Sequence, residues 1–153
     1  MTAGITLRQE SPRQTDVARL LEALDGYQSA LYPPESNHFL DVEALAVPSV
    51  RFFVARRAGD ALGCAALRVD PEGYGELKRM FVTPAARGLR LGRRLLERIE
   101  EEARGLGLGS VRLETGIHQL EALGLYRSAG YLEREPFGDY TLDPLSVFME
   151  KRL

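Results

Sequence analysis

The strongest constraint on the fold is a single change of hydrophobic period, which occurs at Thr83-Pro84. Before it, residues 51–57, 61–69 and 76–82 are rich in apolar residues and are separated by short turns. After it, apolar residues recur every three or four positions from 91 to 106, which is the period of an amphipathic helix. The pattern predicts three consecutive antiparallel strands followed by a helix that crosses the sheet.

The flanking regions add strands and helices at both ends of this unit. Residues 5–7 alternate as a strand does, and Ser11-Pro12 has the pattern of a capped helix start for a helix that reaches Leu31. The remaining expected elements are a helical turn at 41–45, a strand at 111–115 parallel to 76–82, a helix at 119–129, and strands at 131–134 and 145–151. Residues 1–153 are therefore predicted to form a single α/β domain, with a mixed, mostly antiparallel sheet of six to seven strands flanked by helices.

Composition and charge argue against several classes of protein. The chain has 153 residues and a formal net charge of −2, so no overall positive field attracts nucleic acid or an anionic membrane. The sequence contains no signal-peptide pattern and no apolar run of the roughly 18 residues that a membrane span needs. Cys64 is the one cysteine, which excludes an internal disulfide, and no cysteine or histidine spacing suits a metal. We expect a cytoplasmic protein without a metal.

The turn from Arg87 to Gly92 lies between a predicted strand and the start of the longest predicted helix. Amide groups at a helix N-terminus point outward and carry partial positive charge, so this turn suits a pyrophosphate. Its sequence, RGLRLG, matches neither a Walker loop nor the G-x-G-x-x-G dinucleotide motif. Taken alone, the segment is explained equally well as a glycine-rich helix start with solvated arginines.

Three motifs together resemble the GNAT superfamily of N-acetyltransferases. The strand sequence ELKRMFV at 76–82 precedes RGLRLG at 87–92, and LYRSAGY follows at 125–131. The superfamily's hallmark turn is Arg/Gln-x-x-Gly-x-Gly/Ala, and Arg90 departs from it by standing at the middle glycine. The order of predicted elements agrees with that fold over nearly the whole chain. The segments YPPES at 32–36 and PFGDY with Pro144-Leu145-Ser146 further resemble a bacterial subgroup of uncharacterised members.

This resemblance implies that the protein transfers an acetyl group from acetyl-CoA (coenzyme A) to an amine. In such proteins the turn amides bind the pyrophosphate, the strand pairs with the pantetheine arm, and an N–H near Phe81 polarises the thioester. Tyr126 matches the general acid, although by spacing alone it is a core aromatic with its hydroxyl at the rim. The implied cofactor-binding residues are Met80, Phe81, Val82, Arg87, Gly88, Leu89, Arg90, Leu91, Gly92, Gln119 and Tyr126.

Acetyl transfer also requires an unprotonated amine, which is rare at neutral pH for a group whose pKa is about 10.4. A carboxylate, or a water bound to one, therefore has to accept the amine proton. Glu76, on the same predicted strand as Phe81, is our leading candidate for this general base, and Glu114 on the neighbouring strand is the rival. A solvated carboxylate at a strand end is the simpler explanation of either residue.

The acceptor is expected where the first helices and the last loop meet the sheet. Candidate contacts there are acidic, aromatic or imidazole side chains, which suit a small-molecule or peptide amine: Tyr32, Glu35, His38, Phe137 and Tyr140.

Other functions are compatible with parts of the sequence. A non-catalytic acyl-CoA-binding or sensing module would explain Arg90 as degeneration of the turn. Nucleic-acid binding through the arginines of residues 87–98 is disfavoured, because glutamates share the same helix and no aromatic stacking pattern accompanies them. The resemblance is compatible with a homodimer, but the sequence identifies no interface.

Overall fold

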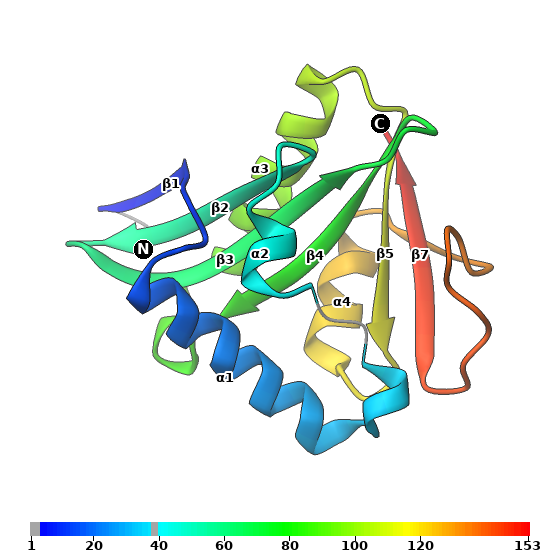
Figure 1. Ribbon diagram of the computed structural model, residues 1–153, viewed down its shortest axis with the longest axis horizontal. Coiled ribbons are helices and arrows are strands. Elements are labelled where there is room, and N and C mark those ends of the chain that lie inside the picture. The colour runs from blue at the N-terminus through cyan, green and yellow to red at the C-terminus, as the bar shows by residue number, and fades with distance from the viewer. Residues whose placement is uncertain (1–3, 38–39) are drawn as a thin grey trace.

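The computed structural model describes residues 4–37 and 40–153 and contains one seven-stranded sheet with helices on both faces (Figure 1). The strands are β1 (Ile5–Gln9), β2 (Val50–Arg57), β3 (Asp60–Val69), β4 (Tyr74–Val82), β5 (Ser110–Gly116), β6 (Leu132–Arg134) and β7 (Ser146–Arg152). The helices are α1 (Thr15–Leu31), α2 (Val42–Leu45), α3 (Leu91–Gly105) and α4 (Leu120–Ser128), with short 3₁₀ turns η1 (Pro34–Ser36) and η2 (Pro84–Ala86). The predicted α/β class and mostly antiparallel sheet are confirmed.

The sheet has the strand order β1-β2-β3-β4-β5-β7-β6, and only the β4–β5 pair is parallel. That pair is short, because it joins only residues 74–76 of β4 to residues 110–112 of β5. Beyond these residues the two strands diverge (Figure 1), while β5 stays paired with β7 along its whole length. The sheet is therefore continuous at one end and split at the other.

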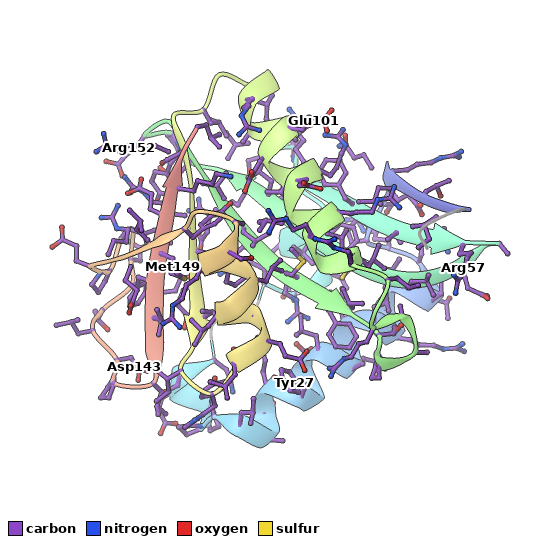
Figure 2. The ribbon with its side chains drawn as sticks, turned by 180° about the vertical axis from the view of Figure 1, so that it is seen from behind. Tyr27, Arg57, Glu101, Asp143, Met149 and Arg152 are labelled. Carbon is purple, nitrogen blue, oxygen red and sulfur yellow. The ribbon has the colours of Figure 1, made fainter. Side chains whose placement is uncertain are left out.

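Two apolar cores lie on opposite faces of the sheet. Strand β2 shows the division, since Phe52 packs in the core beneath α1 and its neighbour Phe53 packs in the core beneath α3. This follows from the alternation of side chains along a strand. Figure 2, which views the molecule from behind, shows α3 and α4 side by side on the second face. The helices thus fix the directions of β4 and β5 on both sides of the split.

Strand β4 contains a bulge just after its paired part. Opposite β4, Cys64 aligns with Phe81 but Ala66 aligns with Lys78, so one residue of β3 faces two residues of β4. Arg79 occupies the extra position with a φ of 55°, in the left-handed region. Its guanidinium makes an ion pair with Asp25 of α1, which ties the helix to the bulge.

The start of α1 differs from the predicted capping pattern. The helix begins at Thr15, and Gln14 stands at its cap position without a side-chain capping bond. The Ser11 hydroxyl instead accepts a hydrogen bond from the amide of Arg13 at 3.0 Å, which satisfies a local turn before the helix. The short helix α2 does have a side-chain cap, Asp41, and forms where a helical turn was expected. No helix within the described ranges is long and apolar enough to cross a membrane.

Candidate active site

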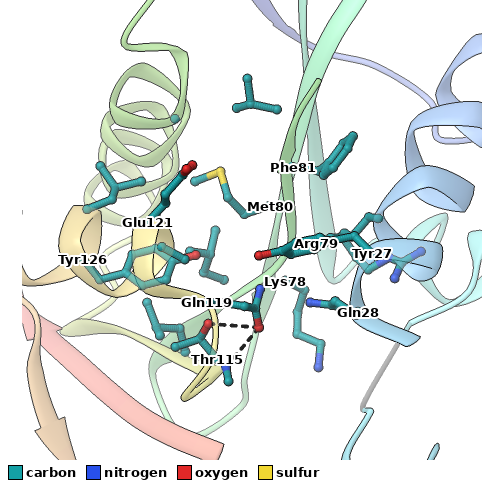
Figure 3. Close-up of a pocket in the computed structure, with 18 of the residues that line it drawn as sticks. Tyr27, Gln28, Lys78, Arg79, Met80, Phe81, Thr115, Gln119, Glu121 and Tyr126 are labelled. Carbon is teal, nitrogen blue, oxygen red and sulfur yellow. Dashed lines mark hydrogen bonds between the residues drawn. The ribbon is translucent and has the colours of Figure 1, made fainter. Parts of the chain in front are cut away.

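A cleft of about 670 Å³ occupies the split between β4 and β5 (Figure 3). One side is formed by α1 and η1, and the other by the starts of α3 and α4. Among the residues that line it are Tyr27, Gln28, Tyr32, Ser36, Asn37, Lys78, Arg79, Met80, Phe81, Val82, Arg87, Gly88, Arg90, Leu91, Gly92, Glu114, Thr115, Gln119, Glu121, Tyr126 and Leu145. No group of three or more His, Cys, Asp or Glu side chains in residues 4–37 and 40–153 could hold a metal ion.

The turn before α3 presents backbone amides at one end of this cleft. The first helical bond runs from the amide of Arg94 to the carbonyl of Arg90, and Gly88 has a φ of 86°. Within the described parts of the chain, the amides of residues 88–93 have no hydrogen-bond acceptor. Such free amides at the N-terminus of a long helix are chemically suited to a pyrophosphate.

Arg90 adopts the backbone conformation that the hallmark glycine would favour. Its φ of 57° lies in the left-handed region, and its exposed side chain makes no capping bond to the turn. The side chain therefore leaves the amides open. Holding a non-glycine residue there costs about 1–2 kcal/mol, so the turn keeps its shape with some strain.

Strand β4 offers an unpaired backbone edge to the cleft. Residues 77–82 all line the opening, and β5 pairs with none of them. An extended ligand with amide groups can add to such an edge as a further strand does. Met80, Phe81 and Val82, which the resemblance assigns to the pantetheine arm, belong to this open edge and line the same cleft as the turn residues Arg87 and Gly88.

Tyr126 enters the cleft from α4, and its hydroxyl points toward β4 in Figure 3. The side chain is only 5% exposed, and its hydroxyl has no hydrogen-bond partner among the described residues. Burial raises the pKa of this hydroxyl above its usual value, with a smaller contribution from the charge of Glu114. Tyr126 is therefore a protonated hydroxyl facing a cleft.

Gln119 has a structural role at the N-terminus of α4, where it occupies the cap position. Its side-chain oxygen accepts a hydrogen bond from the amide of Gly116 at 3.0 Å, and Thr115 Oγ1 lies 3.5 Å from it (Figure 3). These contacts fix the turn between β5 and α4. Gln119 also lines the cleft, so the amide side chain borders the space expected for the cofactor.

Two carboxylates line the cleft: Glu121, which is exposed and pairs with Arg87 at the turn, and Glu114, which lies deeper. Glu114 projects from the separated part of β5, and one oxygen, Oε2, accepts a hydrogen bond from the hydroxyl of Ser146 at 2.7 Å. Burial raises its pKa to about 7, against the smaller opposing effects of Ser146 and the Lys78 ammonium. A carboxyl group of this kind accepts and releases a proton near neutral pH.

Glu76, our leading base from the sequence, is not among the cleft-lining residues. It lies in the paired part of β4, is 3% exposed and faces Arg68 across the β3–β4 ladder. Arg68 donates to Oε1 at 3.1 Å, and Tyr140 donates to Oε2 at 2.6 Å. Lys78 lies 3.5 Å from the same Oε2. Glu76 is thus enclosed by hydrogen-bond and ion-pair partners and is kept away from the cleft.

The residues predicted to contact the acceptor are spread over different environments. Tyr32 lines the cleft, stacks on His118 and accepts a hydrogen bond from its amide, so it braces the β5–α4 turn. Glu35 is exposed and outside the cleft, and His38 lies outside the described residues. Phe137 is buried in an aromatic cluster with Tyr74 and Phe148, and does not line the cleft.

Tyr140 lies behind the cleft, where it bonds Glu76 and Lys78. The sequence reasoning missed four cleft residues of the acceptor end, which are Tyr27, Gln28, Ser36 and Lys78. Only Lys78 had a usable signal, because it lies on the strand 76–82 that was expected to pair with the cofactor. The sequence does not show that the end of α1 packs against the turn after β5.

Comparisons with known proteins agree with this geometry. The family model for the acetyltransferase (GNAT) family matches residues 17–131. A protein of Azospirillum brasilense named IAA acetyltransferase is 57% identical over 98% of this chain and 99% of its own. A Klebsiella pneumoniae structure described as an acyl-CoA N-acyltransferase is 39% identical, with a TM-score of 0.83 and 97% coverage of both chains.

A Salmonella typhimurium acetyltransferase structure that contains acetyl-CoA shares the fold, with a TM-score of 0.67, 20% identity, and coverage of 97% of this chain and 94% of its own. The family match covers most of the chain, and the relative from Azospirillum brasilense covers nearly all of it. This protein therefore belongs to the acetyltransferase (GNAT) family and is an acetyl-CoA-dependent N-acetyltransferase.

Proposed function

We propose that the protein moves the acetyl group of acetyl-CoA directly to a primary amine, with Glu114 as general base and Tyr126 as general acid. One observation carries the proposal: a carboxyl group with a pKa near 7 and a protonated tyrosine line the same cleft, which ends at free helix amides. The base is Glu114 rather than Glu76, because Glu114 lines the cleft and Glu76 is enclosed by Arg68 and Tyr140.

The donor fits along the open half of the sheet. Acetyl-CoA supplies an activated thioester. Backbone amides of residues 88–92 hold its pyrophosphate, and the edge of β4 at residues 80–82 holds its amide-containing arm. A backbone N–H near Phe81 then polarises the thioester carbonyl. With the pyrophosphate held at the start of α3 and the arm held along β4 as far as the bulge, the reacting carbon lies between Tyr126 and Glu114.

The two side chains balance the protons of the reaction. The amine arrives mostly as an ammonium ion, and the Glu114 carboxylate removes a proton so that the nitrogen can attack the carbonyl carbon. The new carbon–nitrogen bond forms as the carbon–sulfur bond breaks. Tyr126 donates its proton to the leaving sulfur, and its raised pKa keeps it protonated until then. The nitrogen loses its second proton as the amide forms, and this proton returns to the Tyr126 oxygen. The proton held by Glu114 is the one released to water at the end of the cycle. The products are the acetylated amine and the free thiol of coenzyme A.

The acceptor enters from the end of the cleft bordered by α1 and η1. Tyr27, Gln28, Tyr32 and Asn37 line this end and offer ring faces and amide groups beside Glu114. We propose a small-molecule or peptide amine as the acceptor, because the opening admits an amine-bearing chain between α1 and β5.

Calorimetry with acetyl-CoA, followed by a thiol-release assay on a panel of amines, tests the function. Tyr126→Phe should lower kcat about 100-fold and leave acetyl-CoA binding unchanged, because it removes only the proton donor. Tyr131→Phe is the matched control, since that buried hydroxyl bonds Glu100 instead of facing the cleft. Binding of acetyl-CoA without turnover of any amine would favour the non-catalytic acyl-CoA-binding module.

A further inference from the structure

Two segments that are far apart in the sequence join at the acceptor end of the cleft. The hydroxyl of Ser36, in η1, donates to Oδ2 of Asp143 in the loop before β7 at 2.7 Å. In Figure 2, Asp143 lies at the end of this loop, beside the segment that follows α1. The contact links the YPPES segment to the segment that contains Pro144-Leu145-Ser146, so both belong to one wall.

Asp143 also determines how β7 begins. Its Oδ1 accepts a hydrogen bond from the amide of Leu145 at 2.9 Å, and its carbonyl accepts one from the amide of Ser146 at 3.0 Å. This tight turn places Ser146 opposite Gly116, at the first register position of the β5–β7 ladder. The backbone of Ser146 is therefore held from the turn on one side and from the sheet on the other.

From this position the Ser146 hydroxyl reaches Glu114. Glu114 pairs with Phe148, two residues beyond Ser146, so both side chains lie on the same face of the sheet. Ser146 Oγ donates to Glu114 Oε2 at 2.7 Å. In residues 4–37 and 40–153, no hydrogen-bond donor contacts the other oxygen, Oε1. Ser146 therefore holds one carboxylate oxygen, while Oε1 has no donor among these residues and Glu114 as a residue lines the cleft.

We propose that Ser146 is a positioning residue for acetyl transfer: it holds Glu114 Oε2 so that Oε1 receives the proton of the acceptor amine. The inference rests on the proposed role of Glu114 as the base. Ser146 acts through Glu114 and does not itself touch the reacting atoms.

Several other groups act on Glu114 from the elements packed around it. The Lys78 ammonium favours the carboxylate, whereas the charges of Glu76 and Asp143 and burial itself disfavour it. Among the described residues, three tyrosines also feel the charge of Glu114, and because their pKa values are raised they are uncharged at neutral pH: Tyr32, Tyr126 and Tyr140. Replacing Ser146 leaves all of these groups in place, so its contribution can be measured separately.

The direct test is an NMR titration of the Glu114 carboxyl carbon in the acceptor-free protein, with Glu114→Gln used to assign the signal. Ser146→Ala removes a bond to the charged form, so the pKa of Glu114 should rise by about one pH unit. Ser146→Thr keeps the hydroxyl on a β-branched side chain and should restore the wild-type value. Ser11→Ala, in the exposed turn before α1, is the control and should cause no shift. A Ser146→Ala titration that matches the wild type would overturn the proposal.

Kinetics with acetyl-CoA and an amine from the panel separate this inference from the proposed function. Ser146→Ala should move the acidic limb of kcat/KM upward by the same interval, losing about tenfold activity below the limb and little above it. If Glu114→Gln keeps full activity, the proposed base is wrong, whatever Ser146 does. If Glu114→Gln is inactive while Ser146→Ala leaves the limb unmoved, only the positioning role is wrong.

Discussion

Glu76 and Glu114 are carboxylates on neighbouring strands, but the two halves of the split sheet give them opposite environments. Glu76 lies where β4 and β5 pair. It accepts hydrogen bonds from Arg68 and from the Tyr140 hydroxyl, and it forms an ion pair with Lys78. Glu114 lies where the strands have separated, and its one direct hydrogen bond among the described residues comes from the neutral Ser146 hydroxyl. The environment of each carboxylate therefore depends on where the pairing between β4 and β5 ends.

The difference in charge compensation separates a structural carboxylate from a reactive one. A buried carboxylate with cationic partners, as Glu76 is, links the side chains of β3 and β4. The partly buried carboxylate of Glu114, whose one direct donor among the described residues is a hydroxyl, has its pKa raised to about 7, so it exchanges protons at neutral pH. The first three of the four predictions below test this contrast and the fourth tests the turn before α3, starting with the largest expected effect.

The largest effect is expected from Glu114→Gln. The amide retains the size of the side chain but cannot accept the proton of the amine, so kcat should fall by about 10²–10⁴-fold. Calorimetry should show unchanged binding of acetyl-CoA, since the turn amides and the β4 edge remain. Thiol release measured at saturating amine checks the loss. A variant with wild-type turnover would contradict the contrast between the two carboxylates.

Glu76→Gln should mainly affect stability. Removing this charge leaves Arg68 and Lys78 without a carboxylate that both contact, so the free energy of unfolding should fall by about 3 kcal/mol. Urea unfolding checks the loss, and turnover per folded molecule should stay within about threefold of the wild type. If the variant kept its stability but lost turnover as Glu114→Gln does, the two roles would be reversed.

The stability of the protein should also depend on the charge of Glu114. Its pKa is about 7 in the folded protein, against 4.5 for the ordinary group, so the folded state binds the proton more tightly. Its contribution to stability is complete below pH 4.5 and is lost as the pH rises through 7. Glu114→Gln should therefore be more stable than the wild type at pH 8, by about 3 kcal/mol, and equal to it at pH 4.

Thermal or urea unfolding of both proteins at the two pH values measures this difference. Glu76→Gln serves as the comparison, because at pH 8 it should be less stable than the wild type, whereas Glu114→Gln should be more stable. Equal stability of Glu114→Gln and the wild type at pH 8 would mean that the buried charge carries no cost.

The smallest effect is expected at the turn before α3, residues 87–92. Arg90→Gly should raise the free energy of unfolding by roughly 0.5–1 kcal/mol, because glycine adopts a positive φ without strain. Arg93→Gly, within the first turn of α3, is the matched control and should lower it by about 1 kcal/mol. Urea unfolding of the two variants checks both signs. A loss of stability in Arg90→Gly would contradict the strain at this residue.

Much of the fold could be predicted from the change of hydrophobic period at Thr83-Pro84. The meander, the crossover helix and the glycine-containing turn before it all follow from local patterns. The length of the β4–β5 pairing could not be predicted, because it depends on how α1, α3 and α4 pack on the two faces. The left-handed backbone of Arg90 likewise has no signal in its residue type.

The site was predictable only where a motif marked it. The motif around Tyr126 identified that residue as a site candidate, and it does line the cleft. No motif distinguished Glu76 from Glu114, since both looked like strand-end carboxylates. Their environments depend on distant residues, since Tyr140 and Ser146 follow Glu76 and Glu114 by 64 and 32 positions. Phe137 was selected as an aromatic acceptor contact, but its ring completes a buried cluster with Tyr74 and Phe148.

The pH dependence of kcat/KM in the wild-type enzyme tests the central claim most directly. With Glu114 as the base, kcat/KM should rise with a slope of one through a pH of about 7 and then level off. Glu114→Gln should lack this limb. A wild-type profile of kcat/KM that rises without a break toward the pKa of the amine would show that only amine already deprotonated in solution reacts. That result would contradict the assignment of Glu114 as the base.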